Sequence, residues 1–154
     1  MRRIPRIKGP YVEHTVTVRV RFQEMDALGI AWHGHYLSYF EAARVALGDR
    51  YGVGYHDMLT AGLIAPIVKV SCDYLAPARF NEELRVTARL RCQRIARLDM
   101  HYEVRRGADE MLLALGETAQ VFTGTNGDML LSTPDLLERF LKACEEGVHP
   151  LIHA

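Results

Sequence analysis

The chain has 154 residues, and its 19 Lys plus Arg side chains equal its 19 Asp plus Glu side chains. This balance supplies no excess positive field for a nucleic acid, and no run approaches the roughly eighteen apolar residues of a membrane span. We therefore expect one soluble domain at residues 12–154, located in the cytoplasm, with no nucleic-acid partner and no membrane span. Residues 1–11 begin MRRIPRIK, which lacks the apolar core of a signal peptide and is expected to be a flexible tail.

The first predicted elements are a strand and a long helix. Apolar residues alternate from Val12 through Phe22, which indicates a strand with one buried face. From Tyr36 the apolar positions follow helical spacing as far as Leu47, and Gly52 is a plausible stop. Roughly sixteen helical residues give a rod of about 24 Å, long enough to cross a sheet.

The rest of the chain is expected to be mostly strands. An irregular connection at residues 52–65, with a short helical turn at 57–61, precedes them, and turns are expected at 107–110 and 126–127. A closing helix should begin with Pro134 as its first helical residue and end at Gly147. The predicted strands span residues 67–74, 83–94, 97–105 and 111–122, the last of them apolar on both faces.

The predicted order is one strand, the long helix and then four consecutive strands. Because strands and helices do not alternate along the chain, this order predicts an α+β fold with a five-stranded antiparallel sheet. One face of this sheet would cover the long helix. The other face, which carries Arg85, Arg89 and Arg91, must meet water, a partner or another subunit. Cys72, Cys92 and Cys144 are odd in number and widely spaced, so we expect buried reduced thiols rather than bridges or metal ligands.

Asp26 is the candidate for chemistry, because its loop delivers the chain to the start of the long helix. Unsatisfied N–H groups and the positive end of the helix dipole meet there, and they can stabilise a developing oxyanion. An ionised Asp26 could act as nucleophile or general base. The alternative on physics alone is a helix cap or dipole partner.

Residues 21–44, RFQEMDALGIAWHGHYLSYFEAAR, resemble the signature of the 4-hydroxybenzoyl-CoA thioesterase family of hotdog-fold proteins. The similarity is to the branch that includes the Tol-Pal-associated acyl-CoA thioesterases. It extends more loosely through KVSCDYLAPARFNEELRV. The resemblance implies a hotdog fold, in which an antiparallel sheet wraps the long helix, and hydrolysis of an acyl-CoA thioester.

The resemblance also implies site residues. The family's catalytic carboxylate falls on Asp26, with Glu24 at the first acidic position, and the residue whose N–H polarises the thioester carbonyl falls on His33. The His33 side chain is a second catalytic candidate, with a solvent-facing polar residue as the alternative. Gly34 and Tyr36 are expected to complete the oxyanion and substrate-binding set.

Three departures from the family pattern bear on this site. Phe22 stands where several relatives have tyrosine, which removes a hydroxyl, and Met25 stands where threonine is common. His35 follows Gly34 where Ala-Asn is common, which changes the polarity beside the helix start.

Other roles are expected as follows. His33 and His35 form a His-x-His pair, but no third ligand with metal-site spacing follows, so we expect no metal and no cofactor beyond the CoA of the substrate.

Glu41 is a possible second carboxylate, although solvent exposure or pairing with Arg44 is favoured. Residues expected to meet the CoA phosphates are Lys69, Arg94 and Arg97.

We expect a homodimer or homotetramer that binds acyl-CoA. One rival function is dehydration or hydration of an acyl thioester, which would pair His33 with Glu41. The other is a non-catalytic subunit that binds acyl-CoA or an acyl carrier.

Overall fold

The structure, a computed structural model, describes residues 7–146. The first six residues of the tail predicted for 1–11 and the helix stop predicted at Gly147 lie outside this range. The first strand begins at Tyr11, one residue inside the predicted tail.

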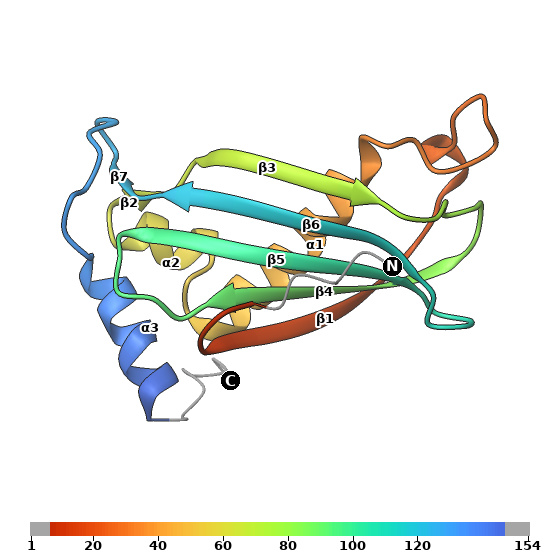
Figure 1. The fold of residues 1–154 in the computed structure, drawn as a ribbon. Helices are drawn as coiled ribbons and strands as arrows, with labels where there is room; N and C mark the ends of the chain where they lie inside the picture. The colour runs from red at the N-terminus through yellow and green to blue at the C-terminus, as the bar shows by residue number, and fades with distance from the viewer. Residues whose placement is uncertain (1–6, 147–154) are drawn as a thin grey trace.

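A five-stranded antiparallel sheet dominates the fold, as the sequence predicted (Figure 1). Its inner face is formed by the alternating apolar residues, which are buried, while the residues between them stay at least partly exposed. The strand order is β1-β4-β5-β6-β3. The strands are β1 (Tyr11–Arg19), β3 (Ile67–Tyr74), β4 (Glu83–Arg91), β5 (Arg97–Arg106) and β6 (Leu112–Val121).

The long helix α1 (His35–Tyr51) lies against one face of the sheet (Figure 1). Its predicted apolar face is confirmed, since Phe40 and Leu47 are almost completely buried. Phe40 stacks on Tyr102 of β5 with ring centroids 4.6 Å apart. A Cβ atom at Gly116 of β6 would overlap the Phe40 ring, so this glycine allows the helix to approach the sheet closely.

The end of the first strand differs from the prediction. β1 stops at Arg19, where its pairing with Glu83 of β4 ends, and Phe22 lies in a 3-10 helix, η1 (Phe22–Glu24). Phe22 is 77% exposed and packs edge-on against Phe80. The apolar alternation therefore continues to Phe22, three residues beyond the end of β1, because β4 offers no residue to pair with after Arg19.

Four short elements complete the fold. The helical turn predicted at 57–61 is α2 (Tyr55–Thr60), which begins two residues earlier and ends one residue earlier than predicted. The short strands β2 (Leu63–Ile64) and β7 (Thr123–Gly124), which were not predicted, pair with each other. The closing helix α3 (Asp135–Glu145) begins one residue later than expected, after Pro134. None of the helices within residues 7–146 is long and apolar enough to cross a membrane.

The two edge strands of the sheet differ. On β1 the apolar residues Val12, Val16 and Val18 pack against the core. On β3 the apolar side chains are open to solvent, with Val68 58% and Val70 44% exposed. β3 therefore presents an apolar edge that nothing covers within the described chain.

Candidate active site

The loop between η1 and α1 is held in place by Glu24. This carboxylate is 4% exposed and accepts hydrogen bonds from the Arg21 N–H (2.7 Å) and the Tyr39 hydroxyl (3.3 Å). The main-chain oxygen of Glu24 accepts a third bond, from the Trp32 N–H (2.9 Å). Of the two acidic positions in the motif, Glu24 thus serves to attach the loop to the helix.

Asp26 lies at the tip of this loop in a tight local turn. Its Oδ1 accepts the Leu28 N–H at 2.8 Å, and its main chain bonds to Gly29 and Ile30. Gly29 has a φ of 73°, a conformation that costs glycine little. These contacts occupy only Oδ1, and within residues 7–146 no group donates to Oδ2. Asp26 is half-buried and lines the adjoining pocket.

The start of α1 supplies hydrogen-bond donors beside Asp26. Gly34 is the N-cap and provides no side-chain cap. In the described part of the chain, the N–H groups of His33 and Gly34 donate to no acceptor. The Trp32 ring lies over Gly34, where a Cβ atom would overlap it. Free N–H groups at a helix start are the arrangement that binds an oxyanion.

Tyr74, the last residue of β3, meets this helix start from the far side of the pocket. Its hydroxyl donates to the main-chain oxygen of His33 at 2.7 Å, and its ring packs edge-on against Tyr36 with centroids 5.1 Å apart. Burial raises the pKa of Tyr74 to about 12 and also raises the pKa of Tyr36. Both phenols therefore keep their protons at neutral pH.

Together these residues form a pocket of about 360 Å³. One carboxylate faces walls that are mostly apolar or aromatic, as is usual for small-molecule sites. The structure brings the predicted residues Asp26, His33 and Tyr36 together at this pocket. Its lining residues are Asp26, Leu28, Ile30, Ala31, His33, Tyr36, Tyr74, Leu75, Ala76 and Pro77.

Sequence reasoning did not identify the wall at residues 74–77. Those residues follow the end of β3 and meet the Asp26 loop only through folding, as where the Ala31 N–H donates to the Ala78 oxygen at 2.9 Å. The loose similarity of the segment KVSCDYLAP to the thioesterase family was the available signal.

The other candidate residues lie elsewhere. Lys69 and Arg97 line a separate cavity of about 150 Å³ on the outer sheet face. Arg94 forms ion pairs with Glu138 and Glu145 of α3. A role for Lys69, Arg94 and Arg97 in binding CoA phosphates stays a prediction.

Glu41 pairs with Arg44, as favoured from the sequence. The Arg44 Nε donates to Glu41 at 3.0 Å, and the Tyr55 hydroxyl donates to the same carboxylate at 2.9 Å. Glu41 is absent from the lining of the pocket that holds His33. The pairing of His33 with Glu41 that dehydration chemistry needs is therefore not formed.

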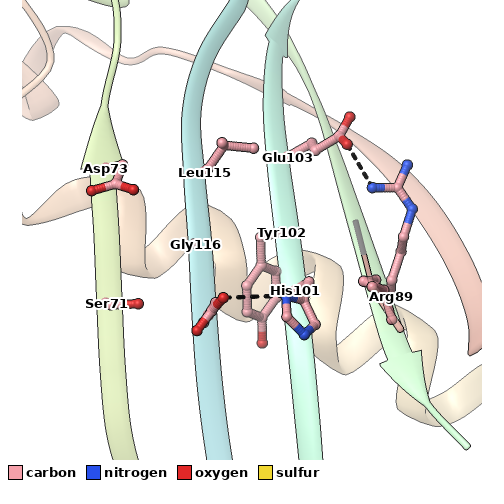
Figure 2. Close-up of a pocket in the computed structure, with 10 residues that line it drawn as sticks. Ser71, Asp73, Arg89, His101, Tyr102, Glu103, Leu115 and Gly116 are labelled. Carbon is pink, nitrogen blue, oxygen red and sulfur yellow. Dashed lines mark hydrogen bonds and ion pairs between the residues drawn. The ribbon is translucent and has the colours of Figure 1, made fainter. Parts of the chain in front are cut away.

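The outer face of the sheet holds a second cavity, of about 260 Å³ (Figure 2). Figure 2 shows Arg89 paired with Glu103, which it contacts at 2.7 Å. His101 lies 3.5 Å from Glu117 at the same cavity. Arg89 and Glu103 thus balance each other's charge at this cavity. Within residues 7–146, no three His, Cys, Asp or Glu side chains cluster so as to hold a metal ion.

Comparison with known proteins identifies similarity to thioesterases. The model of the thioesterase-like superfamily matches residues 20–143. The putative acyl-CoA thioesterase YneP of Bacillus subtilis is 35% identical over 65 residues, which cover 42% of this chain and 47% of that protein. The matched segments span about half the length of the curated relatives.

Two solved structures extend the likeness to most of the chain. The hypothetical protein TT1821 from Thermus thermophilus has 32% identity and a TM-score of 0.74, covering 84% of this chain and 98% of its own. The 1,4-dihydroxy-2-naphthoyl-CoA thioesterase Slr0204 from Synechocystis has 19% identity and a TM-score of 0.75, covering 85% and 96%. The latter likeness concerns the fold, which is the hotdog arrangement of sheet and helix.

Proposed function

Since the chain belongs to the thioesterase-like superfamily, we propose that it is an acyl-CoA thioesterase with its active site in the pocket between the Asp26 loop and the end of β3. The observation that carries this proposal is the single carboxylate with one unengaged oxygen, in a pocket that is also lined by His33, whose free N–H lies just before the start of α1; Gly34, the next residue, does not line the pocket itself. The placement among the Tol-Pal-associated enzymes and the cytoplasmic location stay predictions.

The reaction joins water to the thioester and releases a carboxylic acid and the CoA thiol. The N–H groups of His33 and Gly34 stabilise the negative charge that develops on the carbonyl oxygen, where one such donor typically contributes about 2.7–4 kcal/mol. The His33 side chain lines the same pocket and assists by orienting water. No metal or cofactor takes part in this proposed reaction.

Asp26 can act by two routes. In the first, a carboxylate oxygen attacks the carbonyl carbon, the thiolate leaves, and water hydrolyses the resulting anhydride. In the second, Asp26 removes a proton from a water molecule that attacks the carbonyl carbon directly. Incorporation of ¹⁸O from labelled water into Asp26 during a single turnover selects the first route, and its absence selects the second.

The pocket favours a small acyl or aroyl group. Its volume of about 360 Å³ is at the low end of the roughly 300–1,000 Å³ that ligand sites occupy. The aromatic rings of Tyr36 and Tyr74 line it and suit a flat acyl group. The name of the neighbour Slr0204, a 1,4-dihydroxy-2-naphthoyl-CoA thioesterase, supports an aromatic substrate class.

The decisive experiment incubates the protein with a panel of acyl-CoAs and a thiol reagent. Asp26→Asn keeps an oxygen for the Leu28 N–H, so the loop should survive while thiol release falls by roughly 10²–10⁴-fold. Asp109→Asn is the matched control, because Asp109 also accepts the N–H two residues ahead, from Met111 (3.1 Å), but lies in the β5–β6 turn. Binding of acyl-CoA without turnover by the unaltered protein would instead select the non-catalytic binding subunit.

We also infer that the protein pairs with a second copy through β3. Among residues 7–146 no strand pairs with the outer side of β3, which exposes Val68 and Val70, and an open apolar edge is a template for strand pairing. A two-fold axis perpendicular to the sheet at the β3 edge would pair the two β3 strands antiparallel, continue the sheet across two subunits and bring a second chain toward Tyr74. This proposal favours a dimer as the basic unit.

A further inference from the structure

Two cysteines that are 52 residues apart in the sequence lie side by side. The Sγ atoms of Cys92 and Cys144 are 2.7 Å apart, and both side chains are half-buried free thiols that pack against the core. Cys92 follows β4, and Cys144 lies in the last turn of α3. The sequence predicted separate, buried reduced thiols and gave no sign of this pair.

Independent contacts hold the two thiols together. Arg94, two residues after Cys92, forms ion pairs with Glu138 (3.7 Å) and Glu145 on the same helix as Cys144. On its other side α3 buries Leu137 and Phe140 in the core. The main chain at Cys92 is also fixed, because its N–H donates to the Pro10 oxygen at 2.9 Å. Ion pairs thus join the helix to the turn beside the thiols, and each of the two segments is also anchored to the rest of the fold.

The two thiols are chemically unequal. The hydrogen bond between them lowers the pKa of Cys92 below its ordinary value and raises the pKa of Cys144. Since the thiolate is the nucleophile, the lower pKa favours Cys92 as the attacking sulfur. Burial raises the pKa of Cys72, the third cysteine, on β3, which disfavours its reaction.

We propose that Cys92 and Cys144 are a redox modification site, at which a small-molecule disulfide converts them into a reversible intramolecular disulfide. The Cys92 thiolate attacks one sulfur of the oxidant and releases one thiol, leaving a mixed disulfide. Cys144 then loses its proton and attacks the Cys92 sulfur, which releases the second thiol. Two protein thiols and one small disulfide give one protein disulfide and two small thiols.

The bond would act on stability and leave catalysis unchanged. It would tie α3 to the β4–β5 turn and close the loop between residues 92 and 144, which restricts the unfolded chain. Figure 1 shows α3 at the opposite end of the sheet from the loop that leads into α1 and carries Asp26. Oxidation should therefore raise the melting temperature by roughly 5–10 °C, with hydrolysis of acyl-CoA unaltered.

The test equilibrates the purified protein with mixtures of reduced and oxidised glutathione and maps its peptides without reduction. The expected result is a Cys92–Cys144 linked peptide that appears with the rise in melting temperature and disappears with dithiothreitol. Cys72→Ser should behave like the unaltered protein. Cys144→Ser should instead accumulate glutathione on Cys92, with no rise in melting temperature.

Two results would overturn the proposal: both thiols remaining open to alkylation at every glutathione ratio, or a recovered link that involves Cys72 or a second chain. Neither depends on enzymatic activity. Failure of this site is therefore distinguishable from failure of the proposed hydrolase function.

Discussion

The Tyr74 hydroxyl donates a hydrogen bond of 2.7 Å to the main-chain oxygen of His33. This bond joins the last residue of an edge strand to the peptide immediately before the long helix. The oxygen of His33 belongs to the same peptide unit as the N–H of Gly34, one of the two proposed oxyanion donors. A phenol on β3 therefore orients a main-chain donor on the opposite wall of the pocket.

Replacing Tyr74 with Phe should weaken catalysis more than binding. Loss of one hydrogen bond, typically about 1 kcal/mol, predicts a roughly fivefold fall in kcat, because the Gly34 N–H is held less firmly when the oxyanion forms. KM should change little, since the ring still packs against Tyr36. Steady-state kinetics measure both constants.

Tyr11→Phe is the control for this substitution, because Tyr11 lies on the other edge strand, β1. It should leave kcat unchanged. A Tyr74→Phe enzyme with unaltered kcat, or with a raised KM alone, would contradict the positioning role.

Gly116→Ala should destabilise the fold. The new methyl group would overlap the Phe40 ring, and overpacking of this kind typically costs about 1–3 kcal/mol. Urea unfolding measures the difference. Adding Phe40→Leu should recover part of the loss, because the smaller side chain makes room for the methyl group. Strict additivity of the two substitutions would show that Phe40 does not limit the residue at position 116.

Val70→Lys should prevent the proposed pairing through β3. The substitution places a charge on the apolar edge, which blocks edge-to-edge strand pairing, so sedimentation should show a monomer where the unaltered protein forms a dimer. Thr17→Lys places the same charge on the other edge strand, β1, and should leave the assembly intact. Identical sedimentation of the Val70→Lys variant and the unaltered protein would exclude β3 as the interface.

Stability should fall at alkaline pH in part through Tyr102. Burial raises the pKa of this phenol to about 12, against about 10 for a free tyrosine, so its contribution is complete below pH 10. Between pH 10 and 12 the unfolded chain loses the proton while the folded chain keeps it, and the contribution disappears as pH rises through 12.

The Tyr102→Phe variant isolates this contribution. Its free energy of unfolding should fall by roughly 1 kcal/mol less between pH 9 and 11 than that of the unaltered protein. The variant should also be less stable throughout, because the Thr118 hydroxyl loses its partner at 2.8 Å. Parallel stability curves over this pH range would show that the phenol does not titrate as described.

Much of the fold followed from local patterns. Two-residue alternation identified four of the five long strands, a run that is apolar on both faces identified β6, and helical spacing placed the buried face of α1 on Phe40 and Leu47. Gly52, with a φ of 72°, ends that helix as predicted. The position of Asp26 shortly before the helix start likewise brought it near His33 by chain connectivity alone.

The tertiary structure decided what local patterns do not encode. Alternation assigns a residue to a face of its strand, but it does not say which strand lies beside it or where pairing ends. Phe22 therefore lies outside the sheet. Tyr74 contacts His33, which is 41 residues away in the sequence, and Cys92 contacts Cys144. Each of these outcomes depends on the order of the strands and the packing of helices against them, because contacts between distant segments form only when the whole sheet assembles.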